Sequence, residues 1–130
     1  MAKAGRAIAD RKKIEALTTD KTVVVSDCGT IFTCNSDTVG AFTVTLPTAA
    51  DAGKGWWCKI FRIDDSANDV TIGVNGDQCF GVEVSQTCVE IDATADIVLA
   101  GSNAGLQAEM ISDGTNWLVL AHGVGASSIT

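Results

Sequence analysis

The stretch from Phe42 to Asp64, FTVTLPTAADAGKGWWCKIFRID, constrains the fold more than any other part of the chain. Apolar and threonine residues alternate from Phe42, which is typical of a strand with one buried face, and Pro47 ends the run because proline has no N–H for a sheet. The glycine-marked segment 48–55 predicts a connection, and residues 56–63 predict a second strand with large apolar side chains. Aromatic side chains bury roughly 150–250 Å² each, so we expect this stretch to centre the core.

Short strand patterns follow one another from residue 22 to residue 122, separated by turn signals. Asn75-Gly76-Asp77 predicts a hairpin, and Asp113-Gly114-Thr115 predicts a tight turn into the last strand. This spacing predicts an all-β fold, a single β-sandwich or barrel of about 8–9 short antiparallel strands. We divide the chain into a basic N-terminal arm (1–21), a β-domain (22–122) and a C-terminal tail (123–130).

The arm contains the one segment with a helical pattern. In residues 7–17, AIADRKKIEAL, the apolar residues Ala7, Ile14 and Leu17 fall near one face of a helix. A helix this short is marginal in water by itself. We therefore expect a short N-terminal helix that is ordered only by docking, with the capsid or a neighbouring subunit as the expected partner. The alternatives are that it folds back on its own β-domain, or that its charges only keep the segment soluble.

Composition and charge exclude several classes of function. With 130 residues, of which 46% are hydrophobic and 19% charged, the chain is a single folded domain rather than a disordered one. It has no apolar run near the ~20 residues of a membrane span. The net charge of −7 divides into +3 over residues 1–21 and −10 over the rest. An acidic body repels nucleic acid and anionic membranes, so we expect neither as a partner.

The five cysteines do not form a recognisable framework. Their number is odd and none lies in a C-x-x-C motif, so complete pairing within one chain and zinc-knuckle spacing are both excluded. We expect small buried thiols in a protein made in a reducing cytosol. A Cys28–Cys34 bridge across a hairpin is the alternative.

No motif supports catalysis or a metal site. His122 has no Ser or Cys partner with an acid in a known order, so a catalytic triad is unsupported. Asp64-x-Ser66-x-Asn68 has the first oxygen positions of a calcium loop but lacks the glycine at position six and the acid at position twelve, which predicts a turn. We predict no enzyme activity, no cofactor and no bound metal.

Three tryptophans dominate the large apolar residues. Trp56 and Trp57 are neighbours, so on a strand they face opposite ways, and one of them enters the core. The other is exposed unless a subunit contact or a second core layer covers it. We assign Trp56 to a subunit interface and Trp117, behind a turn, to the core.

The order of several segments resembles a β-module that is common in tailed bacteriophages. The marks are TVTLP before a glycine-flanked loop, the strand WWCKIFRID after it, DVTIGVNGD, and the closing ISDGTNWLVL. Such modules occur in capsid decoration (cement) proteins and in tail-fibre segments, and the resemblance covers about residues 20–122.

The resemblance implies a structural virion protein, a homotrimer without enzyme activity. The chain is one module with a short arm, which favours a head decoration protein on the capsid surface, with the major capsid protein as its partner. A trimeric tail-fibre module that contacts host glycans or another tail protein is the alternative. The expected capsid and subunit contacts are the charged and apolar residues of the arm with one tryptophan: Arg6, Ile8, Arg11, Lys12, Lys13, Ile14, Leu17 and Trp56.

Overall fold

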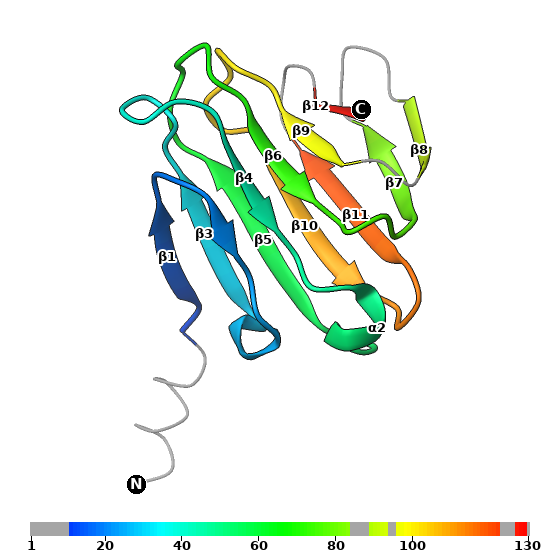
Figure 1. Cartoon of the computed structure of the whole chain (residues 1–130). Coiled ribbons are helices and arrows are strands. Elements are labelled where there is room, and N and C mark those ends of the chain that lie inside the picture. Colours follow the sequence, from blue (N-terminus) through cyan, green and yellow to red (C-terminus); the bar gives the residue numbers. More distant parts are fainter. Residues whose placement is uncertain (1–10, 84–88, 94–95, 123–126, 130) are drawn as a thin grey trace, which may run out of the picture.

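A computed structural model describes residues 11–83, 89–93, 96–122 and 127–129, and this part of the chain is mostly β. Its elements are, in chain order, β1 (Lys13–Leu17), β2 (Lys21–Thr22), the 3-10 helix η1 (Val25–Asp27), β3 (Thr30–Cys34), β4 (Phe42–Thr45), α2 (Ala49–Ala52), β5 (Trp57–Arg62), β6 (Val70–Gly73), β7 (Cys79–Glu83), β8 (Val89–Ala93), β9 (Ile97–Leu99), β10 (Gln107–Ser112), β11 (Trp117–His122) and β12 (Ser127–Ile129). The strands form two layers that face each other (Figure 1). The seven-stranded sheet has the order β1-β3-β5-β10-β11-β7-β8, and the five-stranded sheet has the order β12-β9-β6-β4-β2.

The first six strands alternate between the two sheets. β1, β3 and β5 lie side by side in the seven-stranded sheet and pair in parallel. β2, β4 and β6 do the same in the five-stranded sheet. Each of three successive coils of chain therefore gives one strand to each layer, as in a solenoid.

The later strands complete both sheets differently. β10 pairs antiparallel with β5 on one side and with β11 on the other. β7 then runs parallel to β11, and β8 closes an antiparallel pair with β7. In the other sheet β9 is antiparallel to both β6 and β12.

The predicted fold class is wrong in its strand arrangement. The sheets are mixed, with parallel pairs throughout the first half, and they do not close into a barrel. The hairpin predicted at Asn75-Gly76 is also wrong. Both residues have the positive φ that such a turn needs, 56° and 78°, but the turn carries the chain from β6 in one sheet to β7 in the other. Alternation indicates a strand and its buried face, and it does not indicate the partner strand.

The predicted N-terminal helix is not found in the described part of the arm. Residues 13–17 form β1, which pairs in parallel with β3 from Lys13↔Thr30 to Leu17↔Cys34. Sheet pairing at an open edge outweighs the weak helical preference of so short a segment. Residues 7–10 of that predicted helix lie outside the described residues. At the other end, Ser127–Ile129 in the predicted tail pairs with β9.

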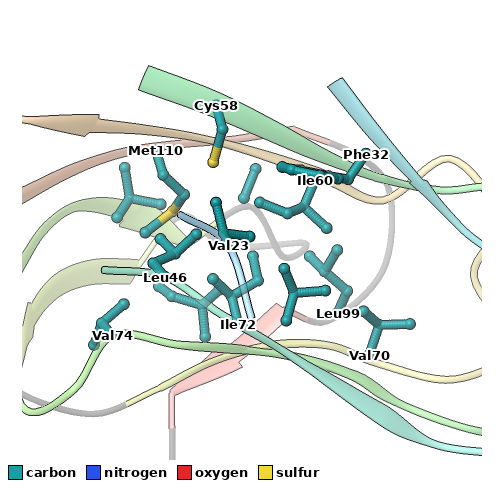
Figure 2. Packing of buried hydrophobic residues seen from close by; sticks show 14 of the residues in the cluster. Val23, Phe32, Leu46, Cys58, Ile60, Val70, Ile72, Val74, Leu99 and Met110 are labelled. Carbon is teal, nitrogen blue, oxygen red and sulfur yellow. The ribbon is translucent and has the colours of Figure 1, made fainter. Parts of the chain in front are cut away.

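The core lies between the two sheets. From the seven-stranded sheet it takes Phe32, Cys58, Ile60 and Met110, and from the five-stranded sheet Ile72, among others, all fully buried (Figure 2). As predicted, Trp117 belongs to this core, and its ring meets Trp56 edge-on with centroids 5.7 Å apart. Thr48 caps α2 by accepting a hydrogen bond from the backbone N–H of Asp51, and this helix ends where the chain turns into β5.

Candidate interaction surface

The outer face of the seven-stranded sheet carries a cluster of exposed apolar side chains. On β7, Phe80 and Val82 are 39% and 47% exposed, and on the neighbouring β11, Leu118 and Leu120 are 39% and 48% exposed. The pairing places Leu118 beside Phe80 and Leu120 beside Val82. We call these four residues the exposed quartet. Single exposed apolar residues are ordinary, but four in contact on one face mark an interaction surface.

The apolar surface extends from the quartet across β10 to β5. Leu118 lies opposite Ile111 on β10, and Ile111 lies opposite Trp57 on β5. Trp57 and Ile111 are half-buried. One continuous row, Trp57, Ile111, Leu118 and Phe80, thus crosses four neighbouring strands. Such a row is typical of a surface that another layer covers.

A second row, next to the first, contains a charge pair. It runs from Lys59 on β5 to Glu109 on β10, which face each other across the pairing, and then to Leu120 and Val82. On the far side, Lys59 lies beside Ile31 of β3, which lies beside Ile14 of β1. The outer face is therefore apolar with charges at its middle.

This surface was not predicted, although the sequence carries a signal for it. β11 reads WLVLAH and β7 reads CFGVE, with apolar residues on both faces instead of every second position. Strands that are apolar on both faces are typical of sheets covered on both sides. The inner positions of β11, Trp117 and Val119, fill the core, so Leu118 and Leu120 are left on the outer face.

The two adjacent tryptophans face opposite ways as predicted, but with the roles reversed. Trp56 is the buried one at 4% exposure, and its indole N–H donates to the carbonyl of Val25 at 2.7 Å. Trp56 is therefore held in the protein's own core, which corrects its assignment to an interface. Trp57 lies on the outer face, with the Lys12 ammonium 5.3 Å from its ring centroid.

The predicted contact residues of the arm separate into three groups. Arg11, Lys12, Lys13 and Ile14 are exposed, and Ile14 at 65% is the most exposed large apolar residue described. Leu17 is buried in the core at 8% exposure, so it fills no groove of a partner in this structure. Arg6 and Ile8 lie outside the described residues. Two arm cations meet acids of their own chain, Lys13 with Asp27 at 3.8 Å and Lys21 with Glu15 at 3.3 Å.

The calcium-like segment Asp64-x-Ser66-x-Asn68 surrounds an arginine. The fully buried guanidinium of Arg62 donates to the backbone carbonyls of Asp64, Ser66 and Asn68, and to that of Leu99 on β9. It also donates to the Asp64 carboxylate at 3.2 Å. The Asp64 carboxylate, the first oxygen ligand of a calcium-like loop, thus meets a cation supplied by the chain itself. The prediction of a turn at this segment is consistent with these contacts.

Asp64 is the anionic centre of the same cluster. Its carboxylate accepts hydrogen bonds from the backbone N–H and hydroxyl of Ser36 at 3.0 and 3.1 Å, and from the hydroxyl of Ser66. Burial raises the pKa of Asp64, but the hydrogen bonds from Ser66 and Ser36 and the charge of Arg62 outweigh it and leave the pKa below its usual value. The cluster joins the end of β3, the β5–β6 loop and β9.

Four cysteines lie in the described part, and all four are free thiols. The alternative of a Cys28–Cys34 bridge is therefore wrong, and Cys88 lies outside the described residues. Burial raises the pKa of Cys34 to about 12 and that of Cys79 to about 11. It also raises the pKa of Cys58. Cys28 is exposed.

Neither a metal site among the described residues nor a known relative assigns a function to the chain. Within the described residues no three His, Cys, Asp or Glu side chains are grouped closely enough to bind a metal ion, and no helix there has the length and apolarity to span a membrane. The side chain of His122 is outside the described part. No protein-family model matches the chain, and no curated protein matches its sequence.

Proposed function

We propose that the protein is a bacteriophage head decoration (cement) protein. In this role it is a non-enzymatic virion protein, made in the host cytoplasm, that binds the outer capsid as a homotrimer. It stabilises contacts between copies of the major capsid protein. The order of segments that resembles phage β-modules supports the proposal.

The single observation that carries the proposal is the outer face of the seven-stranded sheet. Its apolar row, with the exposed quartet at one end, is suited to contact with other protein subunits. Three exposed cations, Arg11, Lys12 and Lys13, lie at the β1 edge of the same sheet. A decoration protein needs a broad surface of this kind, because it acts by binding several neighbours at once.

Copy number on the particle tests the proposal directly. We expect quantitative mass spectrometry of purified particles of the encoding phage to find hundreds of copies per particle, and a cryo-EM map to place them on the head. Particles depleted of the protein should lose capsid stability to heat and regain it when purified protein is added back. A few copies located at the tail would contradict head decoration.

One observation favours the tail-fibre alternative. The strands β1 to β6 form stacked parallel coils, and stacked coils are the building principle of elongated solenoid proteins. In that role the apolar outer face would contact another tail protein or copies of the same chain. The copy-number measurement separates the two functions.

A further inference from the structure

We infer that the outer face of the seven-stranded sheet is where copies of this chain meet, with the β1–β3–β5 side of one copy against the β11–β7 side of the next. This inference rests on the proposed homotrimer and specifies the contact that would form it. Three features of the described residues carry it: the apolar row, the distribution of charge across the sheet, and the size of the face.

The strands of this sheet come from two segments of the chain that carry opposite net charge. All nine Lys and Arg residues lie at or before Arg62, together with six of the 16 acidic residues, so residues 1–62 carry +3. The remaining residues contain ten acids and no Lys or Arg, and carry −10. β1, β3 and β5 come from the first part, and β10, β11, β7 and β8 come from the second. One side of the sheet is therefore supplied by a cationic segment and the other by an acidic one.

This polarity suits a second copy of the same chain better than an unrelated partner. A surface with a cationic and an acidic side complements itself when copies meet head to tail, because each cationic side then faces an acidic side. Lys12 over Trp57 and Lys59 lie on the cationic side. On the other side, Phe80 and Val82 lie in register with Asp92 and Glu90 of β8. Head-to-tail contacts that close on themselves form rings, of which a trimer is one.

The size of the face sets the expected strength of association. Strands lie about 4.8 Å apart and rise about 3.3 Å per residue, so the two or three strands of about six residues that each copy gives to one contact cover roughly 200–300 Å². That is well below the roughly 800 Å² per partner in a standard interface. We therefore expect assembly at micromolar concentrations and not at nanomolar ones.

The test compares two double variants of the full chain by sedimentation velocity over a concentration series. Leu118→Ser with Leu120→Ser removes half of the exposed quartet. Val24→Ser with Val39→Ser removes apolar side chains of similar exposure, 51% and 64%, that lie outside the sheet, before η1 and between β3 and β4. Circular dichroism and thermal unfolding establish that both variants fold as the wild type does.

We expect the wild type to assemble at micromolar concentrations, the quartet variant to need at least tenfold higher concentration, and the control to stay within twofold. Assembly of the wild type should also weaken several-fold between 0.05 and 0.5 M NaCl, because opposite charges meet in the contact. A wild type that stays monomeric up to 100 µM, or a quartet variant that assembles as the wild type does, overturns the inference.

Binding to capsids separates this inference from the proposed function. Purified wild type and quartet variant are each added to particles that lack the protein. If the wild type binds capsids without assembling at any concentration, the inference fails and decoration stands. If it assembles through the quartet but does not bind capsids, decoration fails and the inference stands.

Discussion

Residues 13–73 and residues 79–122 build the same two sheets by different routes. The first part uses three coils, in which each strand meets in parallel the strand one coil later. The second part uses the antiparallel pairs β10–β11 and β7–β8, together with a parallel pair between β7 and β11. The first part stacks coil on coil, whereas the second completes both sheets beside it (Figure 1).

The two parts also differ in what they leave on the surface. The outward positions of β3 and β5 alternate with the core positions and include Thr33 and Lys59, and they are half-buried. Those of β7 and β11 are all apolar and exposed where they are described. The outer side of the first part therefore mixes polar side chains with half-buried apolar ones and has Ile14 exposed at the β1 edge, whereas the second part carries the more continuous exposed apolar surface.

Arg62 joins the two parts, and its loss should have the largest effect. The variant Arg62→Leu leaves the buried Asp64 carboxylate without its cationic partner and removes the arginine donor from the carbonyls of Ser66, Asn68 and Leu99. Removing one partner of a buried ion pair costs about 3–5 kcal/mol. We expect a loss of that size in the free energy of unfolding, measured by urea titration.

The control is Lys54→Leu, which removes an exposed cation from the loop before β5. Its effect should stay within about 0.5 kcal/mol, as for ordinary surface substitutions. A similar small change for Arg62→Leu would show that the cluster does not hold the two parts together.

Two strand glycines, one in each part, give a smaller and sharper contrast. A Cβ on Gly81 of β7 would lie 2.3 Å from the carbonyl oxygen of Val119 on β11, whereas a Cβ on Gly73 of β6 would meet its nearest atoms at 3.6 Å. Gly81→Ala should therefore force β7 and β11 apart and cost about 1–3 kcal/mol. Gly73→Ala should be neutral or stabilise by up to about 1 kcal/mol, because it reduces the entropy of the unfolded chain.

Thermal unfolding of both glycine variants checks this contrast. Because the quartet spans β7 and β11, Gly81→Ala should also weaken self-association, and Gly73→Ala should not. Equal destabilisation by the two substitutions would mean that the close approach of β7 and β11 is not a constraint on the fold.

Asp64, in the cluster that joins the two parts, predicts that stability depends on pH. The pKa of its carboxyl group is lowered in the folded protein, so the ionised group stabilises the fold at pH values above the ordinary aspartate pKa. This contribution is lost as the pH falls through the lower folded value. We expect the urea midpoint to fall more steeply with acid in the wild type than in Asp64→Asn. Asp65→Asn, an exposed aspartate in the same loop, is the matched comparison, and its profile should follow that of the wild type. Parallel pH profiles for the wild type and Asp64→Asn would contradict the assignment.

The sequence predicted local features well and partner strands poorly. Short strands separated by turns do run through residues 22–122, and the turn predicted at Asp113-Gly114-Thr115 joins β10 to β11. These features follow from alternation and turn chemistry, which act within a few residues. The parallel coils depend on which distant strand lies alongside, and alternation is the same for a parallel and an antiparallel neighbour.

The candidate surface was only partly predictable for a related reason. The sequence indicated that Trp56 and Trp57 face opposite ways, but which of them enters the core depends on the register of β5 with β10. Helical spacing predicted a helix in the arm, whereas Lys13–Leu17 form β1 and pair with β3 at the edge of the seven-stranded sheet. The sequence WLVLAH shows that β11 is apolar on both faces. Only the burial of Trp117 and Val119 shows that Leu118 and Leu120 lie on the outer face.

Thiol labelling is the mildest probe of the two parts, because it can be measured on the wild-type protein without a substitution. Among the described cysteines, Cys28 is exposed after η1, while Cys34, Cys58 and Cys79 lie in the core. With pKa values of about 12 for Cys34 and about 11 for Cys79, at most about one thiol in a thousand is ionised at pH 8. Iodoacetamide at pH 8 should therefore label Cys28 in native protein within minutes and leave the three buried thiols intact for hours, as read by peptide mass spectrometry.

Gly81→Ala should speed labelling of Cys79, which lies on β7, more than that of Cys34, which lies on β3. Equal acceleration of labelling at both cysteines would show that the two parts open together. They would then differ in strand arrangement and not in local stability.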